Sequence, residues 1–250
     1  ATAIRFLDRG ETVVVAGGEP GRAGDVRLLE ARTGAVRRVL ARSTDVICDV
    51  AVRPGRTELA AAGADGLLRI VDAATGDEVR TLSSHGDWVT AVAYSDDGGR
   101  LASASRDKTV KVFDAAGGEL VATFGGHASP VRGVALSADG KQGFSVGDDK
   151  RLLRWNADDG KAIGNPVALG GEGLRLVRDG ERVFVPTGGK SVAAVEPGSG
   201  KVVPVPHADW PLCVAVHTET GRLASGSLDG EVRLFTLQDG ALVRAWPARP

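Results

Sequence analysis

The feature that most constrains this chain is an internal repeat with a period of about 40 residues. The stretch from Val89 to Phe124 aligns with the stretch from Val131 to Ile163 without a gap through the core of the unit. Three further stretches follow the same frame: Val50 to Leu82, Leu174 to Val203 and Val214 to Trp246. A first copy begins at Ala1 and carries about four extra residues around Glu19–Gly24, as expected of an insertion in a loop. The chain therefore holds six copies of one structural unit.

Each copy contains four short runs in which apolar and polar residues alternate, separated by turn pairs such as Asp97-Gly98 and Asp139-Gly140. This alternation predicts β-strands, and the glycines supply the positive φ that tight turns need. No segment combines a helical period with caps, so we expect almost no helix. A single four-stranded sheet cannot cover both its faces, and a ring of packed sheets can. The sequence predicts an all-β fold, a β-propeller of four-stranded antiparallel blades.

We expect six blades, with part of a seven-bladed ring as the alternative, because propellers of 4–8 blades occur. The chain is then one domain, 1-250, with blades at approximately 1-40, 41-82, 83-124, 125-167, 168-205 and 206-246. A chain without a spare strand would close by side-chain packing alone, unless a longer parent supplies another blade. The absence of Met, even at position 1, leads us to expect a longer parent.

Composition excludes several classes of protein. Lys and Arg number 31 against 32 Asp and Glu, which argues against a general nucleic-acid binder. No apolar run approaches the ~20 residues that a membrane helix needs, so we expect no membrane insertion. The only cysteines, Cys48 and Cys213, lie in different copies, and we expect free thiols. We expect a soluble domain, cytoplasmic or periplasmic, and leave the compartment open.

The fourth copy carries Gly126-His127, Ser145, Asp149 and Trp155-Asn156. With these residues the chain resembles the WD-repeat (Trp-Asp repeat) family of β-propellers over essentially its whole length. The resemblance implies a hydrogen-bonded structural tetrad of His127, Ser145, Asp149 and Trp155 within one blade. It implies partial tetrads in the third and sixth copies, formed by His85, Ser103, Asp107, His207, Ser225 and Asp229. Phe113 and Phe235 stand in those copies where the tetrad has tryptophan, and the second copy keeps only Asp65.

Two longer stretches, VAGGEPGRAGDVRLLEARTG and HGDWVTAVAYSDDGGRLASASRDKTVKVFDAAGG, resemble the propeller part of planctomycete-type bacterial proteins that join a c-type cytochrome module to WD repeats. The haem signature Cys-x-x-Cys-His is absent, so we expect no haem and no other cofactor in these residues. This resemblance adds one alternative function, that of a structural domain attached to a redox module.

Apparent catalytic motifs have structural explanations. Gly143–Gly147 matches the nucleophile elbow, but Ser145 lies within a strand of a repeat and no helix follows it. Gly188–Ser191 ends like a phosphate-binding loop without the helix that such a loop requires. Three of the four histidines recur once per copy, at a spacing that serves the repeat and not a metal. We expect no catalytic residue and no metal site, and therefore no enzyme.

Two tryptophans are unusual, because Trp88 and Trp210 both stand three residues after the repeat histidine. In WD-repeat proteins this slot opens on the top face of the ring, where partners often dock. The other residues expected on this face are Arg106, Asp148, Leu228, Val46 and Pro130. We expect a protein or peptide to bind there, on a monomeric ring that acts as a scaffold. The alternative is that both indoles form wedges between blades.

A second class of function is binding of a small anion, or chemistry, at the channel mouth. The inner strands carry Arg5, Arg132 and Arg175, together with Asp49. Three guanidinium groups near one axis could hold an anion, so the sequence leaves this weaker alternative open.

Overall fold

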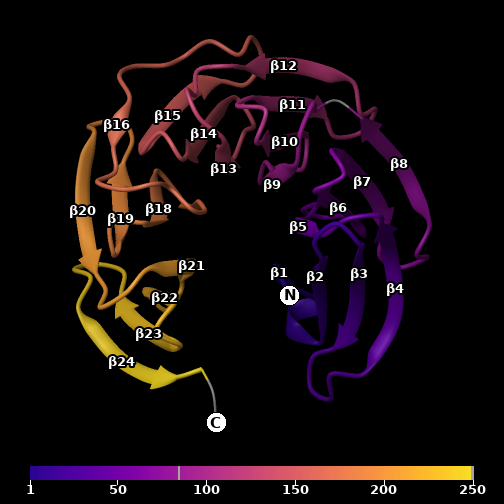
Figure 1. The fold of residues 1–250 in the computed structure, drawn as a ribbon, viewed down its shortest axis with the longest axis horizontal. Coiled ribbons are helices and arrows are strands. Elements are labelled where there is room, and N and C mark those ends of the chain that lie inside the picture. Colours follow the sequence, from indigo (N-terminus) through magenta and orange to yellow (C-terminus); the bar gives the residue numbers. More distant parts are fainter. Residues whose placement is uncertain (84, 249–250) are drawn as a thin grey trace.

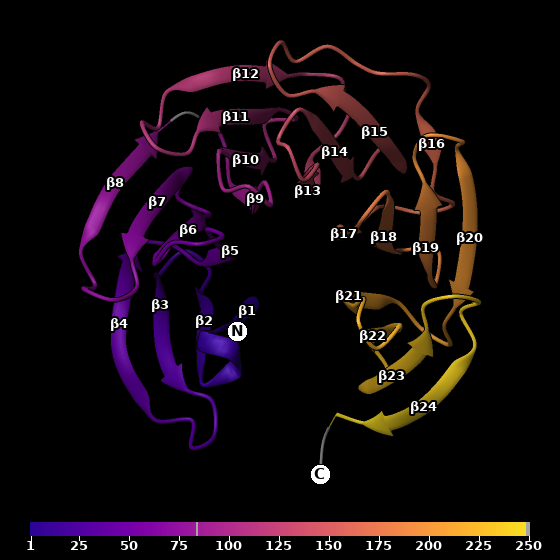
Figure 2. The same ribbon diagram turned by 180° about the vertical axis from the view of Figure 1, so that it is seen from behind.

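The structure of this protein is a computed structural model that describes residues 1–83 and 85–248. It contains six antiparallel sheets of four strands each, and within every sheet the strands follow one another in sequence order. The sheets are arranged as blades around a central channel (Figures 1 and 2). The prediction of a six-bladed, all-β propeller is confirmed. In the described part of the chain the only helix is the short 3-10 turn η1 (Asp8–Gly10).

Each blade is formed by four consecutive strands. The first three blades contain β1 (Ala3–Leu7), β2 (Thr12–Glu19), β3 (Ala23–Glu30), β4 (Val36–Ser43); β5 (Ile47–Val52), β6 (Glu58–Gly63), β7 (Leu67–Asp72), β8 (Glu78–Ser83); β9 (Val89–Tyr94), β10 (Arg100–Ser105), β11 (Val110–Asp114) and β12 (Leu120–Phe124). The last three contain β13 (Val131–Leu136), β14 (Gln142–Gly147), β15 (Arg151–Asn156), β16 (Val167–Ala168); β17 (Val177–Asp179), β18 (Arg182–Thr187), β19 (Ser191–Glu196), β20 (Lys201–Pro206); β21 (Pro211–His217), β22 (Arg222–Ser227), β23 (Glu231–Thr236) and β24 (Leu242–Pro247). The expected limit between the first two blades is three residues early, because β4 continues to Ser43.

The turns form where the sequence predicts them. Gly98, between β9 and β10, has a φ of 69°, which only glycine adopts without strain. Asp97 stabilises the same turn, because its Oδ1 accepts a hydrogen bond from the Gly99 N–H at 2.9 Å. The repeat thus encodes both the strands and the reversals between them.

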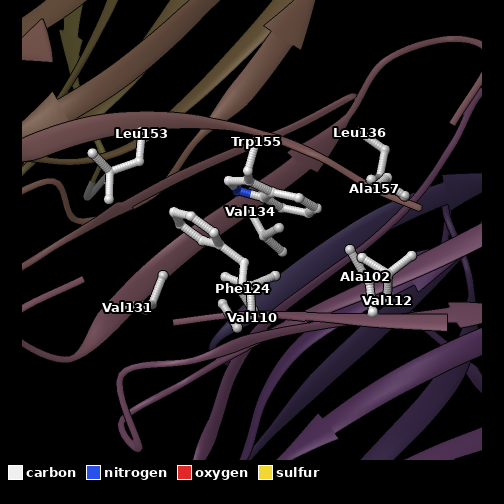
Figure 3. Packing of buried hydrophobic residues seen from close by; sticks show 13 residues of the cluster. Ala102, Val110, Val112, Phe124, Val131, Val134, Leu136, Leu153, Trp155 and Ala157 are labelled. Atoms are coloured by element: carbon white, nitrogen blue, oxygen red, sulfur yellow. The ribbon is translucent and has the colours of Figure 1, made fainter. Parts of the chain in front are cut away.

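Five apolar clusters hold the blades together, one at each seam between consecutive blades. At the seam between the third and fourth blades, Ala102 and Val112 pack against Val134 and Trp155, all nearly inaccessible to water (Figure 3). Small aliphatic side chains predominate, which lets neighbouring sheets approach closely. Burial of these side chains is the main favourable term that fixes one blade on the next.

The ring is open between the first blade, β1–β4, and the sixth, β21–β24 (Figures 1 and 2). Among the described residues no apolar cluster joins these two blades. Ile4 and Phe6 of β1 are 53% and 69% exposed. Closure of six blades by side-chain packing alone is therefore not what the structure shows.

Candidate partner-binding rim

One backbone hydrogen bond recurs along the rim of the propeller and brings the expected top-face residues together. In each of four blades, the residue before the turn aspartate donates its N–H to a backbone carbonyl. The acceptor is the residue three positions after the repeat histidine, or the equivalent residue in the second blade, which lacks that histidine. The donor and acceptor pairs are Ala64 and Val46 at 2.9 Å, Arg106 and Trp88 at 3.0 Å, Asp148 and Pro130 at 3.0 Å, and Leu228 and Trp210 at 2.9 Å. The repeat therefore places two rim residues side by side in each of four blades.

The sixth blade presents the most open part of this rim. Trp210 is 44% exposed and Leu228 is 61% exposed. In the third blade Trp88 is half-buried, and the Arg106 guanidinium lies over its ring, 4.7 Å from the centroid. This cation–π contact fixes the indole and the guanidinium relative to each other. Neither of the two tryptophans is a fully buried wedge between blades.

Val46 does not belong to the exposed rim, which corrects the expectation from its position. Its side chain is 7% exposed. The inserted loop of the first blade lies against this part of the second blade, since the Gly21 N–H donates to Asp45 Oδ1 at 2.7 Å. The same oxygen accepts from the Val46 N–H at 2.7 Å. The insertion therefore lies against the segment that contains Val46.

Pro130 and Asp148 occupy the rim of the fourth blade and are partly buried. Asp148 accepts two hydrogen bonds from Arg132, from Nε and Nη2, both at 2.8 Å. Such a bidentate pair holds both side chains in one orientation. The charge of Asp148 is therefore compensated within the protein. The fourth blade thus exposes less surface for a partner than the third and sixth blades do.

The fourth blade carries a complete chain of hydrogen bonds beneath the rim. Trp155 Nε1–H donates to Ser145 Oγ at 3.1 Å, and the Ser145 hydroxyl donates to His127 Nε2 at 2.8 Å. His127 Nδ1–H then donates to Asp149 Oδ2 at 2.8 Å. Burial lowers the pKa of His127, so the neutral imidazole that this pattern requires is favoured. The network connects two strands, β14 and β15, with the turn between them and the segment that leads into the blade.

The third blade forms the same network without the indole. His85 Nδ1–H donates to Asp107 at 2.8 Å, and Ser103 donates to His85 Nε2 at 2.8 Å. Burial would raise the pKa of Asp107, but hydrogen bonds from Thr109, His85 and the backbone outweigh it and lower that pKa to about 2. Phe113 fills the position of the tryptophan and is buried.

The sixth blade departs from the expected tetrad. Ser225 donates to His207 Nε2 at 2.6 Å, but His207 Nδ1–H donates to the Val205 carbonyl at 2.9 Å and not to Asp229. Asp229 instead pairs with Arg233, whose Nη2 lies 2.6 Å from Oδ2. The expectation that Asp229 belongs to the histidine network is wrong, because a permanently charged guanidinium stands within reach of the carboxylate.

The second blade uses the same alternative. Arg69 Nη2 lies 2.6 Å from Asp65 Oδ2, and Ser43 donates to that oxygen at 2.7 Å. Sequence reasoning missed this substitution of arginine for histidine. Its signal is an arginine four residues after the turn aspartate, which occurs in the second and sixth copies and not in the third or fourth.

The channel arginines are paired with carboxylates. Asp49, which is buried, lies 3.1 Å from Arg5 Nη2 and 3.3 Å from Arg175 Nη1. Arg132 pairs with Asp148, and Arg178 pairs with Asp96 across the channel. The guanidinium groups that could hold an anion therefore satisfy carboxylates of the protein, which argues against anion binding in the channel.

The described residues contain no cluster of three histidine, cysteine or acidic side chains placed to hold a metal ion. Cys48 is half-buried and Cys213 is exposed, and both are free thiols. Burial raises the pKa of Cys48 to about 11, which keeps it protonated and unreactive near neutral pH. Within the described ranges, no helix has the length and apolar character needed to cross a membrane.

Comparison with known proteins agrees with this geometry. The family model described as "WD domain, G-beta repeat" matches residues 76–114, 118–156 and 200–236, the three stretches that carry the repeat histidine, serine and aspartate. No curated protein matches the sequence. Among solved structures, the crystal structure of the computationally designed Ika8 protein is similar, with a TM-score of 0.78 and 23% identity over 98% of this chain and 73% of that chain. The chain is a propeller of six blades that carries three WD repeats, the three stretches that match the family model.

Proposed function

We propose that this propeller is a non-catalytic scaffold that binds a protein or peptide on its top face. The binding surface is the exposed rim, which we define as Trp88, Arg106, Trp210 and Leu228. Rigid propellers place function in the residues at the ends of their strands, where the sheet holds each side chain in position. Proteins of the WD-repeat family commonly act through such interactions.

The observation that carries this proposal is the pair Trp210 and Leu228. Together they expose a large aromatic and an aliphatic side chain, at 44% and 61%. The hydrogen bond from the Leu228 N–H to the Trp210 carbonyl, at 2.9 Å, keeps the two backbones together. Exposed apolar groups on a fixed backbone are costly to solubility, and tryptophan is enriched at binding hot spots. Binding a partner would bury both side chains with little loss of conformational freedom.

The third blade adds charge to this surface. Arg106 stacks on Trp88 and keeps 40% of its side chain exposed, with Asp87 Oδ2 4.0 Å from its Nε. A surface-exposed pair at that distance contributes little, so the guanidinium remains available to a partner. The rim therefore suits a segment with an apolar side chain for the sixth blade and an acidic side chain for Arg106.

Selection of binders from a random peptide library tests this proposal. Selected peptides should bind the wild-type chain and lose about 30-fold in affinity with Trp210→Ala, the loss of about 2 kcal/mol typical of a hot spot. Leu120→Ala removes a side chain that is 51% exposed on an outer strand, and it should leave affinity unchanged. Peptides that bind both variants as tightly as the wild type would overturn the assignment of the rim.

A further inference from the structure

The two blades that border the opening carry exposed apolar residues at positions that are buried at the seams between other blades. We propose that the opening between the first and sixth blades accepts two further four-stranded blades of the same repeat type. The inference rests on the positions of exposed apolar residues within the repeat, on the register of the strands, and on the size of a similar structure. It concerns how the propeller is completed and is independent of the proposed rim.

Among residues 1–83 and 85–248, no preceding blade packs on Ile4 and Phe6 of the first blade, whereas the third blade packs on the equivalent residues of the fourth. Ile4 pairs with Val15 in the register of β1 and β2, as Val134 pairs with Ser145 in β13 and β14. Val134 is 4% exposed because the third blade packs on it, whereas Ile4 is 53% exposed. The next position on the same face is Leu136 in the fourth blade and Phe6 in the first, at 2% and 69%.

On the other side of the opening, Trp246 of the sixth blade is exposed at a position where the third blade has a buried residue. Trp246 pairs with Val232 in β24 and β23, as Phe124 pairs with Val110 in β12 and β11. Phe124 is 3% exposed and stacks on Trp155 of the following blade, with ring centroids 5.6 Å apart. Trp246 has no following blade and is 38% exposed. The Trp246 indole could therefore stack on an aromatic side chain of a following blade, as Phe124 does on Trp155.

The residues around Trp246 resemble those of the second blade on which the third blade packs. Ala224 and Gly226 of β22, together with Val232 of β23, are partly exposed. Ala60 and Ala62 of β6, together with Leu68 of β7, occupy the same positions in the second blade and are buried by the third blade. The sixth blade therefore presents small residues next to a branched one, as the second blade does to its neighbour.

The number of further blades is inferred from the length of the similar solved structure. The six blades align over 98% of this chain and cover 73% of the designed protein's chain. Since six blades correspond to 73% of that chain, the part left over corresponds to about two blades of this size. A ring of eight blades lies within the range that propellers adopt. The shared fold and the uncovered part of that chain thus favour a ring in which two further blades stand between the sixth blade and the first.

Fusion of duplicated blades tests this inference. A copy of residues 84–168, which contain the third and fourth blades, is fused after residue 248, and a second protein receives only residues 84–124. The two-blade fusion should be monomeric, should melt at least about 5 °C above the unfused chain, and should protect Trp246 from iodide. The one-blade fusion should show neither the higher melting temperature nor the protection of Trp246. A two-blade fusion that melts no higher than the unfused chain would overturn the inference, as would a one-blade fusion with the same gain.

Substitution at Phe6 provides an independent measurement. Phe6→Ser should change the melting temperature of the unfused chain by less than about 1 °C, because the side chain is exposed. In the two-blade fusion it should lower the melting temperature by about 5 °C or more, since the ring is then buried. Leu136→Ser, at the equivalent buried position, should destabilise both proteins. A Phe6→Ser loss in the unfused chain as large as that of Leu136→Ser would show that the sixth blade or a second copy already covers this face, against the inference.

Discussion

Gly143 and Trp155 lie directly opposite each other in β14 and β15, and the indole occupies the space that a side chain at position 143 would need. A Cβ atom at Gly143 would lie 2.0 Å from Cη2 of Trp155. In the third and sixth blades the equivalent pairs are Leu101 with Phe113 and Leu223 with Phe235. Tryptophan therefore occurs where the facing residue is glycine, and phenylalanine where it is leucine.

This relationship predicts a specific rescue. Gly143→Ala should destabilise the protein by about 1–3 kcal/mol, because the added methyl forces the buried indole from its position. The double variant Gly143→Leu with Trp155→Phe should recover a large part of that loss, since it recreates the pair of the third blade. Urea unfolding of the single and double variants measures both effects.

Gly125→Ala is the control for this series, because a Cβ there meets no atom within 4 Å and the residue has no positive φ. This variant should unfold at the same urea concentration as the wild type. The account of the pair fails if Gly143→Ala unfolds like Gly125→Ala, or if the double variant is less stable than the single one.

The tetrad of the fourth blade should be sensitive to loss of its carboxylate. Asp149→Ala leaves His127 Nδ1–H without its acceptor in a site where the histidine side chain is fully buried. We expect a loss of about 2–3 kcal/mol in the free energy of unfolding. Asp77→Ala, at an exposed aspartate in a turn, should stay within about 0.5 kcal/mol of the wild type. Equal stability of the two variants would contradict a structural role for the tetrad.

The Asp65–Arg69 pair should behave as a coupled unit. Each side chain is 10% exposed, and the two are joined by hydrogen bonds of 2.6 and 3.2 Å. Removal of one partner leaves the other charge poorly solvated, so Asp65→Ala and Arg69→Ala should both destabilise the protein. The double variant should lose roughly 1–2 kcal/mol less than the sum of the single variants. Strictly additive losses in this double-mutant cycle would show that the pair does not replace the histidine network.

Stability should fall as the pH is lowered from about 7 towards 5. Burial lowers the pKa values of His85, His127 and His207 in the folded protein below their ordinary value of about 6.5. The unfolded chain therefore takes up protons first as the pH falls, and unfolding becomes more favourable. Above about pH 7 both states are neutral and this contribution is complete. Melting temperatures measured from pH 8 to pH 5 should decrease, and the exposed-site variant His217→Ala should show the same slope.

Replacement of these three histidines by glutamine should flatten that slope. A second decrease should follow as the pH falls below about 4, because the pKa of Asp107 in the folded protein is about 2 and the stability it provides is lost through that range. A melting temperature that rises between pH 7 and pH 5 would be incompatible with neutral histidines in the tetrads.

The sequence was sufficient for the repeat, the strands and the number of blades, because a period-2 pattern with glycine turns recurs in every copy. It also identified His127, Ser145, Asp149 and Trp155, which are neighbours only in the folded blade. It could not show that the insertion near Gly21 contacts Asp45, next to the buried Val46, since this contact joins separate blades. The pairing of Asp229 with Arg233 in place of His207 was missed, although the sequence carries its signal, an arginine four residues after the turn aspartate.

The sequence left a closed ring of six blades and part of a larger ring as alternatives, and it could not decide between them. The inner strand of the first blade has the same apolar pattern as the others, so Ile4 and Phe6 look like core residues. Only the curvature of the assembled blades determines whether the sixth blade reaches them. Pattern determines the face of a residue within one sheet, and the arrangement of sheets determines whether that face is covered.

Hydrogen exchange of the chain with and without a selected peptide tests the central claim, that this propeller binds partners on its exposed rim. The account predicts slower amide exchange on peptide binding at residues 86–88, 105–107, 209–212 and 227–229, with the outer strands β12 and β20 unchanged. Slower exchange confined to the outer strands, with the rim segments unchanged, would contradict it.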